Sequence, residues 1–268
     1  MKIKFICQQC GNCCSHIRGR ISREDEEFLK RYAYGKMPLV QLVPLKEMSF
    51  PLWDWEAKRF VEYEKEVKIN AEIKPSRAIL DLNTNKAIIV TYFMDSDSCL
   101  FLKNKKCLIY DKKRAYICRL FPFQKGPFLE TGEKFDKENM FGSCPALKDI
   151  LPEIPDDKKE MIKFLDMVFQ DNSFLNVIQN DIITEFVNKL IVELLKNKTV
   201  RPAMNYPYKF LLKRIDKAEK INLTDFLIEK KIKTKEDINS LIERFDNNID
   251  AIEKINEKII NKNKSIKK

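Results

Sequence analysis

The second half of the chain carries apolar residues at helical spacing. Two stripes fit amphipathic helices, one over residues 161–169 and one over residues 182–194. A third predicted helix begins at the capping sequence Thr234-Lys-Glu-Asp237. Its apolar positions recur every seven residues, at Ile238, Phe245, Ile252 and Ile259. This pattern predicts a helical region whose last helix packs on its own domain, with docking of a protein partner through these helices as the alternative.

The first half shows the two-residue period of strands. Residues 77–82 and 87–93 are rich in β-branched side chains, and a polar stretch at 83–86 separates them, which predicts a hairpin. Residues 99–102 and 107–110 predict a second, tighter hairpin with a cysteine in each arm.

Two helices are predicted before these strands. The first starts at Ser22, whose hydroxyl and acidic neighbours suit a helix N-terminus, and ends at Gly35. Its expected apolar face is formed by Phe28, Leu29 and Tyr32. The second runs over about 52–67, and its expected buried stripe is Trp53, Ala57, Phe60 and Val61.

A proline pair at Pro152 and Pro155 marks the predicted domain boundary. We therefore expect a cysteine-rich domain over residues 1–148 and a helical region over residues 149–268. The predicted fold class is α+β: a small metal-centred domain with short β-hairpins and flanking helices, followed by an all-α C-terminal region.

All eight cysteines fall within the first domain. They are Cys7, Cys10, Cys13, Cys14, Cys99, Cys107, Cys118 and Cys144. A Cys-x-x-Cys turn places two sulfurs at the spacing that metal ligands need, and the N-terminal run repeats this step. Adjacent Cys13 and Cys14 cannot easily bind one tetrahedral ion together, so we expect that one of them serves a second centre or is not a ligand. The Cys-Pro that closes bacterial iron–sulfur runs occurs far away, at Cys144-Pro145.

Disulfides and inert buried thiols are the alternatives to metal binding. Disulfide frameworks belong mainly to short secreted domains, and the few residues before Cys7 are too short for the apolar core of a signal peptide. Isolated buried thiols do not explain a cluster at ligand spacing. We expect a cytoplasmic protein that does not enter the membrane, because no apolar run approaches about 20 residues.

The ordered cysteine motifs resemble a known family. The N-terminal Cys-x-x-Cys-x-x-Cys-Cys is followed by Cys99-Leu-Phe-Leu, Cys107-Leu-Ile-Tyr110 and Cys118-Arg-Leu-Phe-Pro122. Over residues 5–147 this is similar to the cysteine-cluster family of zinc- or iron-chelating proteins, which includes relatives of flagellin lysine N-methylase. The family usually carries Arg-Pro where this chain has Arg114-Ala115, and the interval from Tyr110 to Cys118 is one residue longer here.

Charge is concentrated in the cysteine-rich part. Residues 1–148 hold 27 basic and 19 acidic side chains, whereas residues 149–268 hold 23 and 21. A basic shell would offset thiolate charge, and Arg18, Arg20, Arg114 and Arg119 are the expected neighbours. A nucleic-acid surface is disfavoured, because no nucleic-acid-binding module is recognisable. His16, the single histidine, is expected at the surface rather than on a metal.

The ligand set predicts an iron–sulfur cluster, in the 4Fe–4S form, or Zn²⁺. Our leading hypothesis is a metal-binding protein in metal handling, redox chemistry or protein modification. A lysine N-methyltransferase-like enzyme is an alternative that follows from the resemblance, although the chain has no G-x-G methyl-donor loop. A zinc-stabilised module that binds protein or nucleic acid is the third alternative. Catalytic residues stay unassigned.

Overall fold

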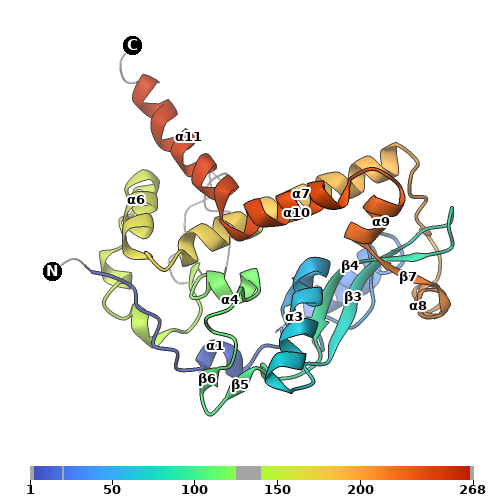
Figure 1. Ribbon diagram of the computed structural model, residues 1–268, viewed down its shortest axis with the longest axis horizontal. Helices are drawn as coiled ribbons and strands as arrows, with labels where there is room; N and C mark the ends of the chain where they lie inside the picture. The colour runs from blue at the N-terminus through green and yellow to red at the C-terminus, as the bar shows by residue number, and fades with distance from the viewer. Residues whose placement is uncertain (1–2, 20, 125–139, 266–268) are drawn as a thin grey trace. The chain divides into compact units, whose positions relative to one another are not determined.

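The computed structural model describes residues 3–19, 21–124 and 140–265, and side chains of the last helix up to Glu257. The fold is α+β, with helices around a mixed sheet (Figure 1). The chain divides into two compact units, each built from separate stretches of sequence. The first consists of Met1–Cys13, Tyr110–Val187 and Asn239–Lys268, and the second of Cys14–Ile109 and Asn188–Ile238. The division into residues 1–148 and 149–268 stays a prediction from the sequence.

The sheet belongs to the second unit and has the order β1-β3-β4-β2, with β7 also paired to β4. The strands are β1 (Val40–Gln41), β2 (Pro51–Trp53), β3 (Ile73–Leu80), β4 (Ala87–Met94) and β7 (Lys220–Asn222). The predicted hairpin is confirmed as the antiparallel pair β3–β4. The other edge of β4 is shared between antiparallel β2 at one end and parallel β7 at the other. Strand β4 is therefore central, and nearly all its residues are buried, as expected for a strand covered on both faces.

Helices of the second unit pack against this sheet (Figure 1). They are α3 (Asp54–Val67), α8 (Tyr208–Lys217) and α9 (Leu223–Glu229). The unit also contains α2 (Arg23–Phe28) and the π-helix η1 (Leu29–Ala33), which contact each other. Helix α3 contacts β4, and α8 contacts β3. Ser22 caps α2 as predicted, with its hydroxyl accepting from the Asp25 N–H at 3.0 Å. The tight hairpin is also confirmed as β5 (Leu102–Lys103) and β6 (Lys106–Cys107).

The first unit is helical and closes around an aromatic core. Its elements include α4 (Tyr116–Leu120), the 3₁₀ turns η2 (Pro145–Leu147) and η3 (Leu151–Glu153), α6 (Lys158–Val168) and α11 (Ile249–Ser265). Helices α7 (Ser173–Lys196) and α10 (Lys235–Asp246) each contribute residues to both units. The stripe predicted over 161–169 is buried here, and Phe169 packs with Phe123 at 4.7 Å between ring centroids.

Three details of the predicted helices are wrong. Phe28 and Tyr32 are exposed rather than buried, at 60% and 52% of their surface. Val61 is exposed too, and the helix predicted from residue 52 begins at Asp54, because Leu52 and Trp53 belong to edge strand β2.

The heptad seam after Thr234 is the third error, because it is not one helix. Thr234 does cap α10, accepting from the Asp237 N–H at 3.0 Å. The helix ends at Asp246, and Asn248 takes a left-handed conformation with φ of 55° before α11 begins. Asparagine tolerates this region better than most residues, so it allows the break. The seven-residue period therefore continues across two separate helices.

A buried carboxylate ties α3 to α9 within the second unit. Asp54 is fully buried, and its Oδ2 accepts hydrogen bonds from the Thr224 N–H at 2.9 Å and from the Thr224 hydroxyl. Burial is the largest effect on this carboxyl and raises its pKa, although the bonds from Thr224 act in the opposite direction.

Replacing Asp54 with Asn tests this environment through the pH dependence of stability. A raised pKa means that the folded state binds the proton more tightly than the unfolded state. The resulting stability is present below the ordinary value of 3.8 and is lost as pH rises through the folded-state value. We expect the unfolding free energy of the wild type, minus that of Asp54→Asn, to fall in urea titrations as pH rises above about 4. A difference that stays constant as pH rises would contradict the assignment.

Candidate metal centre

The N-terminal segment is anchored to the core of the first unit by Phe5. This side chain is 2% exposed, and its ring lies 4.9 Å from that of Phe169, centroid to centroid. The Phe5 N–H also donates to the Val168 carbonyl at 3.0 Å. Cys7, two residues on, packs against the same core while remaining partly exposed. The first thiol is therefore held at the edge of a rigid aromatic cluster.

The backbone turns sharply between the first three thiols. Gln9 and Gly11, on either side of Cys10, have φ values of 50° and 80°. The left-handed region costs a non-glycine residue on the order of 1 kcal/mol, and such positions cluster at functional sites. Cys10 and Cys13 are exposed, so both reach solvent on the outer side of this segment.

Cys144 joins the first three thiols within the same unit. It stands immediately before the 3₁₀ turn η2, and its carbonyl accepts from the Leu147 N–H at 3.1 Å. Burial raises the pKa of the Cys144 thiol, and the nearby thiolates of Cys10, Cys7 and Cys13 raise it further. The Ala146 N–H donates to the Cys144 sulfur and opposes these effects. Cys144 therefore lies within electrostatic range of three thiols from a distant part of the sequence.

Tyr110 is a site residue that sequence reasoning missed. Its hydroxyl is hydrogen-bonded to Cys7, and burial, followed by this bond and the Cys7 charge, raises the pKa of Tyr110. The Arg114 guanidinium lies over the Tyr110 ring at 4.3 Å and donates to the Cys118 carbonyl at 3.4 Å. The only signal in the sequence was the place of Tyr110 at the end of the Cys107 motif, which does not reveal a contact with Cys7.

Cys118 lies in α4, a short helix anchored to the rest of the first unit. The Tyr116 hydroxyl donates to Asp246 Oδ1 at 3.0 Å, and Arg119 donates to the Asp246 carbonyl at 3.1 Å. Ala115 precedes the helix with φ of −56° and ψ of 151°. A proline at this position would have nearly the same φ. Ala115 therefore has a backbone conformation that also suits the proline of the family's usual Arg-Pro.

The other three cysteines belong to the second unit. The Cys99 N–H donates to the Cys14 carbonyl at 2.8 Å, and the Cys99 carbonyl accepts from the Leu102 N–H at 2.9 Å. Leu102 in turn pairs with Cys107 across the β5–β6 hairpin. The boundary between the units falls between Cys13 and Cys14. That Cys13 and Cys14 serve different centres stays a prediction.

Two of the four expected basic neighbours pair with carboxylates. Arg18 pairs with Asp95 at 3.1 Å and with Asp97, and Arg119 pairs with Asp246. Arg20 and most of the loop at 124–143 lie outside the described residues. Arg114 is beside the thiols, through Tyr110 and Cys118. That Arg18 and Arg119 also offset thiolate charge stays a prediction. His16 is exposed, as expected.

The donor chemistry fits a thiophilic metal. The eight cysteines, all within the described ranges, are thiols rather than disulfides. Soft thiolate ligands suit zinc and iron–sulfur clusters and do not suit magnesium or calcium. In the part of the chain that the structure describes, however, no three Cys, His, Asp or Glu side chains form a group that could hold a metal ion.

Comparison with known proteins agrees with this chemistry. Residues 6–145 match the family model described as "CxxCxxCC: Putative zinc- or iron-chelating domain". This match covers more than half of the chain, and the protein belongs to that family. No curated protein and no solved structure matches it. Among the described residues, none of the helices has the length and apolar character that a bilayer crossing requires.

Mild oxidation of the metal-free protein provides a test of the four-thiol neighbourhood. We expect Cys144 to form disulfides with Cys7, Cys10 or Cys13, because these thiols lie close enough to interact, and peptide mass spectrometry would identify the pairs. In guanidinium chloride, the control, oxidation should instead favour pairs close in sequence, such as Cys7 with Cys10. Absence of every Cys144 pair with these three cysteines in the folded protein would contradict the arrangement.

Proposed function

We propose that the protein binds an iron–sulfur cluster of the 4Fe–4S type through Cys7, Cys10, Cys13 and Cys144. The observation that supports this most directly is the placement of Cys144 within electrostatic range of Cys7, Cys10 and Cys13. Three come from successive two-residue steps, and the fourth precedes a proline, as in bacterial iron–sulfur runs. Here the Cys-Pro is supplied from more than a hundred residues away.

Groups around the sulfurs support a bound metal as well. Hydrogen bonds from the Tyr110 hydroxyl to Cys7 and from the Ala146 N–H to Cys144 reduce the negative charge that the metal centre would carry. Such donors are typical of the second shell of thiolate sites, where they tune affinity and reduction potential. Phe5 and the core beneath it would exclude water from the inner side of the centre.

The exposure of Cys10 and Cys13 favours a centre that can exchange with solvent or with a partner. A structural zinc site is usually closed by four well-packed ligands, whereas a cluster near the surface can pass an electron or a metal ion to another protein. We propose a role in redox chemistry or metal handling on this basis. A bound 4Fe–4S cluster would supply one-electron chemistry there.

Cys14, Cys99, Cys107 and Cys118 are the remaining proposed ligands. The backbone bonds that connect the first three support a second thiolate group, which would suit Zn²⁺ or a second cluster. The methyltransferase and the zinc-stabilised interaction module stay predictions from the sequence, as does a cytoplasmic location.

Purification without oxygen tests the iron–sulfur assignment. We expect a brown protein that absorbs broadly near about 400 nm and loses its colour in air. Cys10→Ser should remove most of this absorption, because it removes one corner ligand. His16→Ser is the matched control: it changes an exposed residue six positions away and should leave the spectrum unchanged.

A colourless anaerobic preparation that contains zinc but neither iron nor sulfide would refute the cluster and support the zinc alternative. Retention of full colour in Cys10→Ser would instead remove Cys10 from the ligand set.

A further inference from the structure

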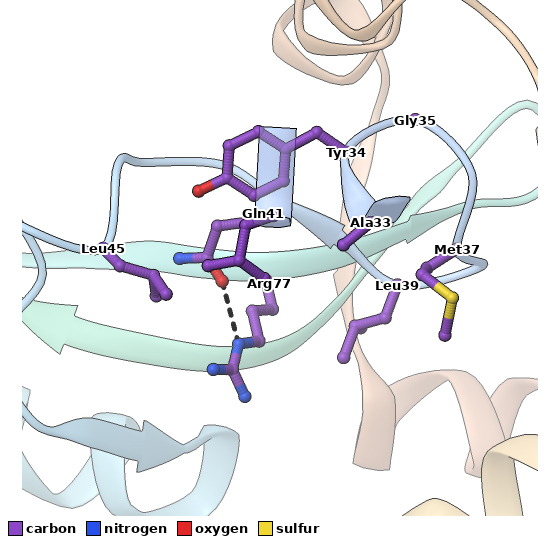
Figure 2. Close-up of a pocket in the computed structure, with 9 residues that line it drawn as sticks. Ala33, Tyr34, Gly35, Met37, Leu39, Gln41, Leu45 and Arg77 are labelled. Carbon is purple, nitrogen blue, oxygen red and sulfur yellow. Dashed lines mark hydrogen bonds between the residues drawn. The ribbon is translucent and has the colours of Figure 1, made fainter. Parts of the chain in front are cut away.

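A small pocket in the second unit has the composition of a ligand site and is not lined by cysteine. It has a volume of about 120 Å³ and lies between the π-helix η1 and strands β1 and β3 (Figure 2). Its apolar lining consists of Leu29, Ala33, Met37, Leu39 and Leu45. An engineered apolar cavity of about 150 Å³ binds benzene, so this pocket has room for a few carbon atoms.

An irregular helix forms one wall of the pocket. After α2 the chain widens into the π-helix Leu29–Ala33, in which the Tyr34 N–H donates to the Leu29 carbonyl at 2.9 Å. Single π-turns of this kind occur frequently at functional sites. Gly35 follows with φ of 79°, and a Cβ there would meet the Tyr206 carbonyl oxygen at 2.6 Å. Glycine is therefore required for the chain to turn at the rim.

Arg77 brings a positive charge to this apolar space. Its Nε donates to Gln41 Oε1 at 3.0 Å, as the dashed line in Figure 2 shows. The Gln41 amide nitrogen is occupied with the Val43 carbonyl at 3.0 Å. Arg77 is thus held by a neutral amide, and in the described ranges no carboxylate pairs with it. Burial lowers the pKa of Arg77, which is the sign of a cation whose charge is not compensated.

Tyr34 lines the pocket on the side of Gln41 away from the Arg77 guanidinium (Figure 2). Its hydroxyl accepts from the Leu45 N–H and is close enough to Arg77 for the two to interact electrostatically. Its ring stacks on Tyr208 at 4.6 Å, and the Tyr208 hydroxyl donates to the Gln41 carbonyl. The phenol is therefore fixed in place. Glu26, whose charge contributes to raising the pKa of Tyr34, is paired with Lys30 at 2.9 Å.

We propose that this pocket binds a small carboxylic acid with a short apolar tail. The carboxylate would accept hydrogen bonds from the Arg77 guanidinium, and the tail would occupy the space between Leu29, Ala33 and Leu39. A single cation in an apolar lining suits a monoanion better than phosphate, which carries more charge and no apolar surface. The pocket would sense or position a metabolite, independently of the metal centre.

Titration of the full-length protein with isovalerate, followed by ligand-observed NMR, tests the proposal. We expect saturable binding of isovalerate, and binding about ten- to a hundredfold weaker for the uncharged isovaleramide and for Arg77→Gln, because each loses a charged hydrogen-bonded pair. Arg23→Gln is the matched control, since Arg23 is an exposed arginine paired with Glu27 and should not change the affinity.

Ala33→Leu provides a second variant that keeps Arg77 and fills the apolar end. It should weaken isovalerate binding, while circular dichroism shows an intact fold. The proposal would be overturned by equal binding of isovalerate and isovaleramide to the wild type, a comparison that needs no variant. Inorganic phosphate binding as tightly as isovalerate, or no saturable isovalerate binding up to about 10 mM, would also overturn it.

Discussion

The surroundings of Cys144, a partly buried thiol near three others, are the feature on which the proposed metal centre depends. Cys144 is partly buried against an aromatic core and is approached by the sulfurs of Cys7, Cys10 and Cys13, and both conditions disfavour its negative charge. A protein gains nothing in stability from gathering like charges, because their interaction energy rises as they approach. A cation that binds all of them reverses the sign of that interaction. A metal bound here would therefore account both for the arrangement of the sulfurs and for the hydrogen-bond donors around them.

The rest of the unit holds these thiols in position. Phe5 fixes the start of the N-terminal segment, and the turn η2 fixes Cys144, each against the core that α6 completes. Tyr110 connects this group to Arg114 and to the backbone of Cys118. Because these contacts join residues 5–13, 110–118 and 144–146, loss of one anchoring side chain would alter the spacing of several sulfurs at once.

Local signals in the sequence predicted much of this fold. The caps at Ser22 and Thr234, the β3–β4 hairpin and the buried stripe of α6 all depend on neighbouring residues, and all are confirmed. The break at Asn248 was missed because a heptad count does not register one left-handed residue. Strands β2 and β7 were missed because each is three residues long and exists only by pairing with β4. The proximity of Cys144 to the first thiols was predicted from ligand spacing. The Tyr110 contact and the Arg77 pocket were not predicted, because each is formed by segments far apart in the sequence, and local patterns do not show which distant segments come into contact.

The central claim is that Cys144 completes a metal centre with Cys7, Cys10 and Cys13. Iron, zinc and acid-labile sulfide should be measured per chain, after anaerobic purification, in the wild type and in Cys144→Ala. The account predicts that the variant loses about four iron atoms and four sulfides per chain relative to the wild type. An unchanged iron and sulfide content in Cys144→Ala, with an intact fold by circular dichroism, would contradict it.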